Sequence, residues 1–240
     1  MSLDATRVTV GYPGTGDVLH RTSLSVPAGA LVGLAGPSGS GKSTMARVLA
    51  LLMQPREGTV TIDGTVVRGA GFAVPSEVRR QVALLFQSPR EATDPRMTLR
   101  AIIEQPAVIA RRAGGVGGGG VVGGGVGGVG VKGLTVEDVA ERVGLTPDLL
   151  TRRPHEVSDG QLQRACIARA LVQRPRYLVC DEATAMLDAA STAGVVRLIR
   201  DEAAAAGMGV LLISHDVELL EAVGAYGQNS MRTLSDTGFA

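Results

Sequence analysis

The stretch LVGLAGPSGSGKSTMARVLA, residues 31–50, decides the fold of this 240-residue chain. An apolar run, 31–35, precedes the glycine-rich segment 36–44, which has the pattern G-x-x-x-x-G-K-S, and a helix-forming run, 45–50, follows it. Glycines at these positions let backbone N–H groups converge on phosphate oxygens, and the following helix points its positive N-terminal end at the same anion. The pattern therefore predicts a phosphate-binding loop between a strand and a helix.

Two side chains of this loop have predicted roles of their own. We expect Lys42 to reach the β and γ phosphates of a nucleotide and Ser43 to hold Mg²⁺. An ordinary Gly/Ser turn is the alternative, and it is the minor one because the whole pattern and both flanking elements are present. The predicted nucleotide-binding run is Gly36, Pro37, Ser38, Gly39, Ser40, Gly41, Lys42, Ser43 and Thr44.

A second segment with predicted chemistry is RYLVCDE, residues 176–182. A near-continuous apolar run before a polar stop predicts a buried parallel strand that ends in two carboxylates. Ligands of open α/β sheets lie beyond the carboxyl ends of the strands. We therefore expect Asp181 to bind Mg²⁺ and Glu182 to act on an attacking water. The alternative is that the two carboxylates cap the next helix.

The segment HEVSDGQLQRACIARAL, residues 155–171, resembles the L-S-G-G-Q signature and following helix of the ABC transporter ATPases. The resemblance implies a second helix start that caps the γ-phosphate of an ATP bound by a partner subunit. Val157 replaces the usual leucine, and Asp159 replaces the first glycine. Because a carboxylate opposes a phosphate, we expect Asp159 to turn partly outward. The residues implied in this contact are Ser158, Gly160 and Gln161.

Four further landmarks of the same family are present along the chain. Gln87 resembles the Q-loop glutamine that senses Mg²⁺, and Asp188 resembles the D-loop aspartate at the nucleotide site. His215 resembles the switch histidine that contacts the γ-phosphate, and Tyr12 takes the place of the aromatic residue that stacks on adenine. Taken alone, Gln87 could cap a strand, His215 could start a solvated helix and Tyr12 could be a hydrophobic plug. Together the landmarks cover nearly all of residues 5–223.

A finer resemblance lies in residues 94–106 and 153–156, which are similar to the dipeptide, oligopeptide and nickel importer branch. It implies an ATP-hydrolysing subunit, with ATP and Mg²⁺ as cofactors, at the cytoplasmic face of the cell membrane. The implied partners are a second ATPase subunit, identical or related, two transmembrane permease subunits and, indirectly, an extracytoplasmic binding protein. The cargo stays open, because in this family it never touches the ATPase chain.

Two other functions remain open at this point. One is a soluble ABC-type ATPase that is not linked to transport. The other is a catalytically weak nucleotide-binding partner subunit, which Asp159 favours. Contact with nucleic acid is not expected, because 24 basic residues balance 23 acidic ones and leave a net charge of +1.

Cysteine usage and the start of the chain point to the cytosol. Cys166 and Cys180 fall in a predicted helix and a predicted buried strand, so we expect small core side chains rather than a disulfide. Residues 1–5 lack the basic and apolar regions of a signal peptide.

The predicted fold class is α/β, with the P-loop NTPase core of an ABC ATPase. We expect a mostly parallel sheet flanked by helices, because strands and helical runs alternate. Short strands at 7–10, 22–26 and 58–62 predict an antiparallel β layer, and an inserted helical subdomain interrupts the core.

The predicted organisation is a single ABC ATP-binding domain over 1–240, with its core in 1–87 and 161–223 and its helical subdomain in 88–160. Residues 114–131 are all glycine or valine. A helix there would lose about 1 kcal/mol per glycine, so we expect a flexible insert and no membrane span. The tail, 224–240, shows no sustained alternation, so either the last strands of the fold are absent or the tail is foreign to it.

Overall fold

The computed structural model describes residues 1–14, 16–113, 135–184, 187, 189–224 and 231–233. The expected glycine-rich insert, 114–131, lies outside the described residues, as do Asp188 and most of the tail.

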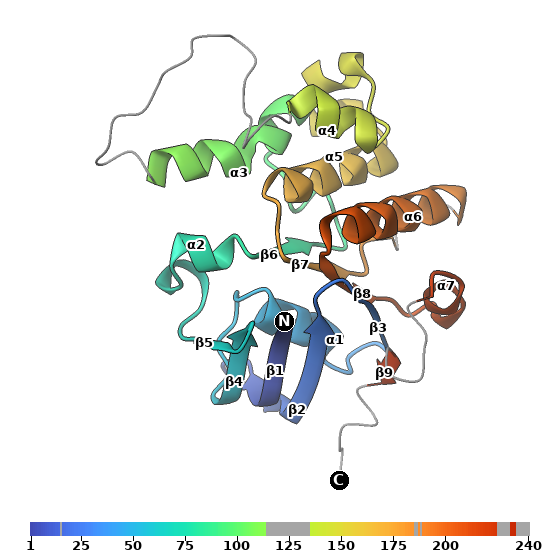
Figure 1. Cartoon of the computed structure of the whole chain (residues 1–240). Coiled ribbons are helices and arrows are strands. Elements are labelled where there is room, and N and C mark those ends of the chain that lie inside the picture. Colours follow the sequence, from blue (N-terminus) through green and yellow to red (C-terminus); the bar gives the residue numbers. More distant parts are fainter. Residues whose placement is uncertain (15, 114–134, 185–186, 188, 225–230, 234–240) are drawn as a thin grey trace. The chain divides into compact units, whose positions relative to one another are not determined.

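The chain divides into two compact units (Figure 1). The first comprises the described residues of Met1–Gln87, Pro175–Ala185 and Thr192–Ala240, and the second those of Ser88–Arg174 and Met186–Ser191. The helix after the signature motif therefore lies in the second unit, whereas the predicted division placed residues from 161 onward in the core. The helix belongs to the second unit because it packs against the other helices there.

An antiparallel sheet forms the first layer of the first unit, as predicted. Alternate residues of β1, such as Leu3 and Ala5, are buried, which is the pattern of a sheet with one face on a core. The turn between the last two strands has positive φ at both Asp63 and Gly64, the geometry that favours a two-residue hairpin. In spatial order the strands are β2 (Asp17–Pro27), β1 (Ser2–Gly11), β4 (Glu57–Ile62) and β5 (Thr65–Val67).

The second layer is a five-stranded sheet whose neighbouring strands, over the described residues, all pair in parallel. Its central strands are buried along their whole length, which explains their unbroken apolar sequences. This confirms the predicted mostly parallel sheet. In spatial order the strands are β6 (Val82–Leu85), β7 (Tyr177–Asp181), β8 (Gly209–Ile213), β3 (Leu31–Ala35) and β9 (Met231–Thr233).

The outer strand β9 was not predicted. It lies in the tail and pairs in parallel with β3, with Gly33 opposite Met231 and Ala35 opposite Thr233. Three residues are too few to show alternation, so the pairing depends on the backbone groups that β3 offers rather than on a side-chain pattern. At least this part of the tail belongs to the fold.

The core of the first unit lies between its sheets and α1. Met45, Val48 and Leu49 of α1 are fully buried against strand residues such as Leu34 and Val179. The helices of this part of the chain are α1 (Lys42–Leu49), α2 (Ser76–Arg79), α6 (Ala189–Ala206), α7 (Val217–Ala222) and the 3₁₀ turn η1 (Gly71–Ala73).

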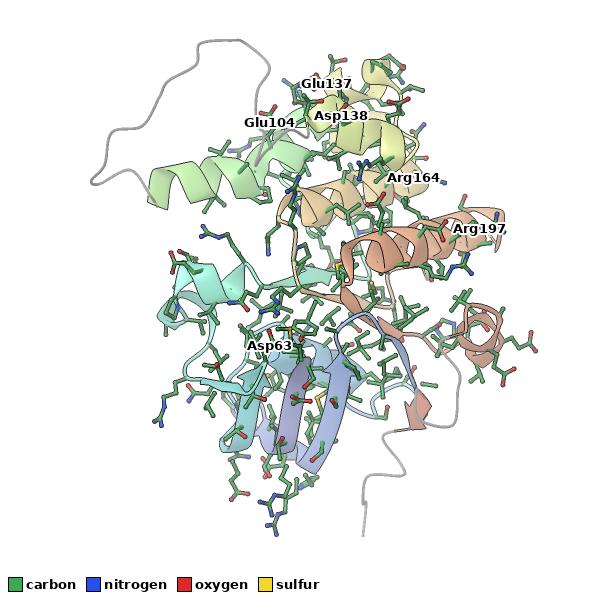
Figure 2. The ribbon with its side chains drawn as sticks, viewed as in Figure 1. Asp63, Glu104, Glu137, Asp138, Arg164 and Arg197 are labelled. Carbon is green, nitrogen blue, oxygen red and sulfur yellow. The ribbon has the colours of Figure 1, made fainter. Side chains whose placement is uncertain are left out.

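The second unit is helical, with α3 and α4 packed against α5. Thr135 and Asp138 form a capping box at the start of α4. Arg100 of α3 donates a 2.5 Å hydrogen bond to Glu137. Figure 2 labels Asp138 and Glu137 in this unit. Cys166, like Cys180 of the first unit, is buried, as expected for a small core side chain. The helices are α3 (Leu99–Ala113), α4 (Val136–Arg142), η2 (Pro147–Thr151), η3 (Pro154–Glu156) and α5 (Asp159–Val172).

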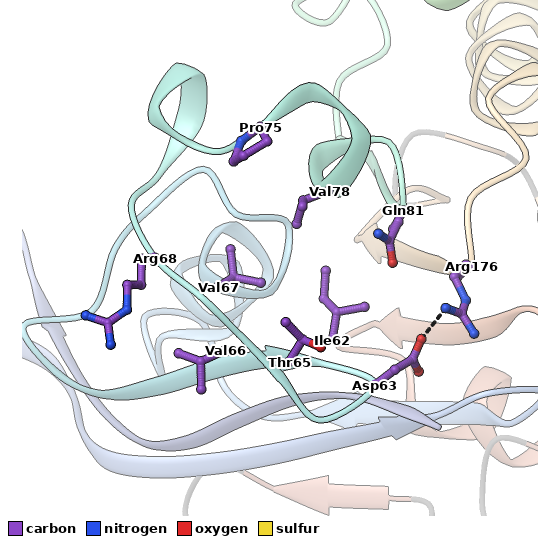
Figure 3. A pocket seen from close by; sticks show the side chains of 10 residues that line it. All are labelled: Ile62, Asp63, Thr65, Val66, Val67, Arg68, Pro75, Val78, Gln81 and Arg176. Atoms are coloured by element: carbon purple, nitrogen blue, oxygen red, sulfur yellow. Dashed lines mark ion pairs between the residues drawn. The ribbon is translucent and has the colours of Figure 1, made fainter.

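Among the described residues, no helix combines the length and the apolar character needed to cross a membrane. A cavity of about 430 Å³ lies between the β4–β5 hairpin and α2, where Asp63 pairs with Arg176 (Figure 3). Arg176 precedes β7 and Asp181 ends it, so this cavity is at the opposite edge of the sheet from the phosphate loop.

Candidate functional site

Four neighbouring parallel strands end at one edge of the sheet. The register places Leu85 beside Cys180, Asp181 beside Ile213, and Ile213 beside Leu34. The residues that follow these strands therefore gather at the same edge. They are the phosphate loop after β3, His215 after β8, Glu182 after β7 and Gln87 after β6.

The phosphate loop (residues 36–44) needs glycine for its backbone path. Gly41 has φ +90°, and a Cβ there would lie 2.7 Å from Cδ2 of Leu19. Gly41 is also the N-cap of α1, and it offers no side-chain cap. The first N–H groups of α1 are therefore left for a ligand, and the helix dipole favours an anion there.

Lys42 is held inside this loop. Its side chain is buried, and Nζ donates to the carbonyl oxygens of Gly36 at 2.7 Å and Pro37 at 2.9 Å. The Ser40 hydroxyl is buried and makes no hydrogen bond to any residue that the structure describes. A positive charge, orphan amides and a hydroxyl without a partner together fit a polyphosphate.

Ser43 and Asp181 meet beside the loop. Ser43 Oγ donates to Asp181 Oδ1 at 3.0 Å, and only 8% of Asp181 is exposed. Burial raises the pKa of the Asp181 carboxyl, and the hydrogen bond from Ser43 partly opposes that rise. A buried carboxylate beside a hydroxyl fits Mg²⁺, which binds proteins through one or two oxygen ligands and the phosphates of a substrate. Gln87 lies exposed, two residues past β6.

Glu182 has a left-handed backbone conformation. Its φ is +47°, which is unfavourable for a residue other than glycine. Its N–H donates a hydrogen bond to the carbonyl oxygen of Ile213 at 3.1 Å. His215 Nδ1 lies 3.9 Å from Glu182 Oε2. The Glu182 side chain is 20% exposed and that of His215 is 66% exposed. The carboxylate is therefore partly shielded, and the imidazole is open to a ligand.

Tyr12 is fixed at the start of α1. Arg47 Nη1 donates to the Tyr12 hydroxyl at 2.7 Å, and the same hydroxyl lies 3.3 Å from Thr44 Oγ1. The tyrosine ring is thus fixed beside the phosphate loop. Sequence reasoning missed Arg47, because an arginine in a helix carries no local sign of a partner 35 positions away.

In the second unit, the signature segment (residues 157–161) starts α5. Ser158 Oγ accepts from the N–H of Gln161 at 3.2 Å, and Gln161 Oε1 accepts from the N–H of Ser158 at 3.0 Å. The Ser158 hydroxyl can still donate its own proton. A Cβ on Gly160 would find ordinary contacts, the nearest at 3.6 Å from Leu187. Packing within the described chain therefore does not require glycine at this position.

Asp159 is partly exposed, as expected, but its charge is compensated. Its Oδ1 lies 2.7 Å from Arg90 Nε, and 43% of the Asp159 side chain is exposed. Sequence reasoning missed Arg90, since nothing near it in sequence marks a partner at position 159.

Comparisons with known proteins place the chain in a family. The sequence profile of the family described as "ABC transporter" matches residues 19–185. The chain is 35% identical over 211 residues to "Putative oligopeptide transport ATP-binding protein YkfD" of Bacillus subtilis, covering 88% of this chain and 60% of that protein. It is 34% identical over 204 residues to "Nickel import ATP-binding protein NikE" of Escherichia coli K12, covering 85% and 71%.

A solved structure agrees with the sequence matches. "Dimeric structure of a post-hydrolysis state of the ATP-binding cassette MJ0796 bound to ADP and Pi" superposes with a TM-score of 0.74 at 26% identity, covering 91% of this chain and 90% of that one. The predicted α/β fold of an ABC ATPase is thereby confirmed. This chain spans about 60% of the length of YkfD, the first relative named above. On the profile match and the similarity to NikE, the chain belongs to the ABC transporter family.

Proposed function

We propose that this chain binds ATP with Mg²⁺ and hydrolyses it as the ATP-binding subunit of an importer for peptides or nickel. The observation that carries the proposal is the gathering of the phosphate loop, Asp181, Glu182 and His215 at one edge of the parallel sheet. In that arrangement a phosphate binder, a metal ligand, a base and a proton donor can act on one substrate.

The residues around the loop bind the phosphates. Lys42 exchanges its two carbonyl contacts for the β and γ phosphate oxygens, and the open amides of α1 bind the remaining oxygens. Ser43 and Asp181 hold Mg²⁺, with Gln87 as a further contact. The bound Mg²⁺ supplies neutralisation of the charge on the phosphates.

The residues after β7 and β8 act on the γ-phosphate. Glu182 orients a water or accepts its proton, because it directly follows the end of β7 and its carboxylate lies 3.9 Å from His215. His215 donates to the γ-phosphate from its exposed position. Tyr12 stacks on the adenine from the place in which Arg47 holds its ring.

A second ATPase subunit, identical or related, completes the nucleotide site. Ser158, Gly160 and Gln161 cap the γ-phosphate of the partner's ATP, and Asp188, which lies outside the described residues, joins the same contact. Two observations support this. Packing within the described chain leaves room for a side chain at Gly160, so the glycine is free to serve a contact with another molecule. The similar cassette MJ0796 is a dimer bound to ADP and Pi.

The importer assignment rests on the relatives. Their names give oligopeptide transport and nickel import, so we propose a complex with two transmembrane permeases and, indirectly, an extracytoplasmic binding protein. In this complex the chain lies at the cytoplasmic face of the membrane.

The test is ATP hydrolysis by the chain assembled in lipid vesicles with its partner ATPase and the two permeases of the proposed complex. Phosphate release that is stimulated by a peptide-loaded or nickel-loaded binding protein supports the proposal. Unstimulated hydrolysis by the isolated chain favours a soluble ATPase instead. ATP binding without phosphate release in the full complex favours the weak partner subunit, the function that Asp159 first suggested.

A further inference from the structure

Arg90 contacts the chain that leads into α5 at three points. Its Nε lies 2.7 Å from Asp159 Oδ1, Nη1 donates to the carbonyl oxygen of Pro154 at 2.9 Å, and Nη2 donates to that of Val157 at 3.3 Å. One guanidinium therefore spans the entry to α5 over residues 154–159. A planar fork of five donors suits such a contact, and the point charge of a lysine does not.

Two consequences follow for the signature segment. The carbonyl contacts fix the backbone immediately before Ser158, whose capping box with Gln161 sets the direction of the helix. The ion pair compensates the only carboxylate of that capping turn, Asp159. Without the arginine, a negative charge would stand at the helix end that is proposed to receive a phosphate.

We infer that Arg90 is a positioning residue for the signature segment, which it orients through two carbonyl groups and neutralises through Asp159. The inference rests on the proposed function in one respect, that the segment meets a phosphate. Arg90 thus lets a chain with aspartate at this position keep a phosphate contact without repulsion.

The structural part of the inference can be tested without nucleotide or partner. Hydrogen exchange of the amides in 154–161 should be about fivefold faster in Arg90→Ala than in the parental chain, the size expected for losing a partly exposed ion pair and its hydrogen bonds. Arg90→Lys should recover only part of the protection. Exchange in 136–142 should stay the same. Arg96→Ala is the matched control, because Arg96 is an exposed arginine of the same connection and its side chain makes no hydrogen bond or ion pair with the described residues 154–159.

The charge part is tested with the partner ATPase and ATP. Arg90→Ala should raise the ATP concentration for half-maximal dimer formation about fivefold, and more at low salt, because screening weakens the repulsion from Asp159. ATP affinity of the dilute monomer, measured at the phosphate loop, should not change. Adding Asp159→Asn to Arg90→Ala should return dimer formation to within about twofold of the parental value, whereas the fast exchange of 154–161 should remain.

The outcomes separate the inference from the proposed function. Unchanged exchange in Arg90→Ala overturns the positioning role. A higher ATP requirement for dimer formation that Asp159→Asn does not lower, and that salt does not alter, overturns the neutralising role. If the parental chain fails to bind ATP, the proposed function fails, while the exchange experiment still decides whether Arg90 orients the segment.

Discussion

The helices α1 and α5 both start at a proposed phosphate contact, yet their starts are built in opposite ways. α1 begins at Gly41, which has a positive φ and no side-chain cap, so its first amides have no side-chain partner. α5 begins at Ser158, whose capping box satisfies the amides of Ser158 and Gln161, and Arg90 compensates the acid of its first turn.

This difference indicates how each helix start meets a ligand. The α1 start carries unsatisfied amide donors and a buried lysine. Binding of a polyphosphate therefore gains free energy, because its oxygens accept from these amides and replace the carbonyl contacts of Lys42. The α5 start has two of its amides bonded inside its own capping box. It gains from a phosphate brought by another molecule, which can accept the Ser158 proton. The α1 start should therefore bind ATP alone, and the α5 start only within a dimer.

The largest expected effect is on the chemical step beside α1. Glu182→Gln keeps the hydrogen-bonding shape and loses the charge that polarises water, so we expect hydrolysis to slow by roughly 10²–10⁴-fold while ATP still binds. The variant should accumulate as an ATP-bound dimer with its partner. Phosphate release and gel filtration measure the two effects. Turnover at the parental rate would move the base to another residue.

The next effect separates the two helix starts by binding. Lys42→Ala should weaken ATP binding about 100-fold, because it removes a charged donor to two phosphates. Calorimetric titration of the monomer with ATP measures it. Ser158→Ala is the comparison variant and should leave monomer affinity unchanged. Equal losses in the two variants would show that both starts bind the same nucleotide within one chain.

A smaller effect concerns stability on the α1 side. Burial raises the pKa of Asp181, so its contribution to stability is present below the unfolded pKa and is lost as pH rises through the folded pKa. Asp181→Asn cannot ionise, so its stability does not fall as pH rises, and its amide oxygen can still accept the hydrogen bond from Ser43. Without nucleotide, the variant should be more stable than the parental chain at pH 7 and equal to it at pH 3. Urea unfolding at both values gives the comparison. A variant less stable at pH 7 would contradict the assigned desolvation.

The smallest effect is on the cap of α5. Ser158→Ala should lower the free energy of unfolding by about 1 kcal/mol, because it leaves an amide of the first turn without its acceptor. Ser158→Asn, which can also cap, should lose less. No change in either variant would mean that the capping box does not stabilise the helix.

Much of the fold was predictable because it depends on local patterns. The loop around Gly41 has a backbone that only glycine adopts easily, and the buried strand before Asp181 is apolar throughout, so both are visible in the sequence. Alternation of strands and helices then predicts a mostly parallel sheet, and the residues after the carboxyl ends of parallel strands lie at one edge.

The remaining features depend on partners far apart in the sequence. Arg90 meets Asp159 across 69 positions, and Arg47 meets Tyr12 across 35, with no pattern to mark either pair. Strand β9 is too short to alternate, and the edge of β3 provides its pairing. The roles of the candidate residues stay predictions, because they concern a nucleotide and a second subunit.

The most direct test follows hydrogen exchange at both helix starts in Glu182→Gln with ATP and Mg²⁺. In dilute monomer, ATP should protect the amides of 39–44 and leave those of 158–162 unchanged. After the partner is added, both stretches should be protected. Protection of 158–162 in the monomer, or none at 39–44, would contradict the account that α1 binds ATP alone and α5 binds it only in a dimer.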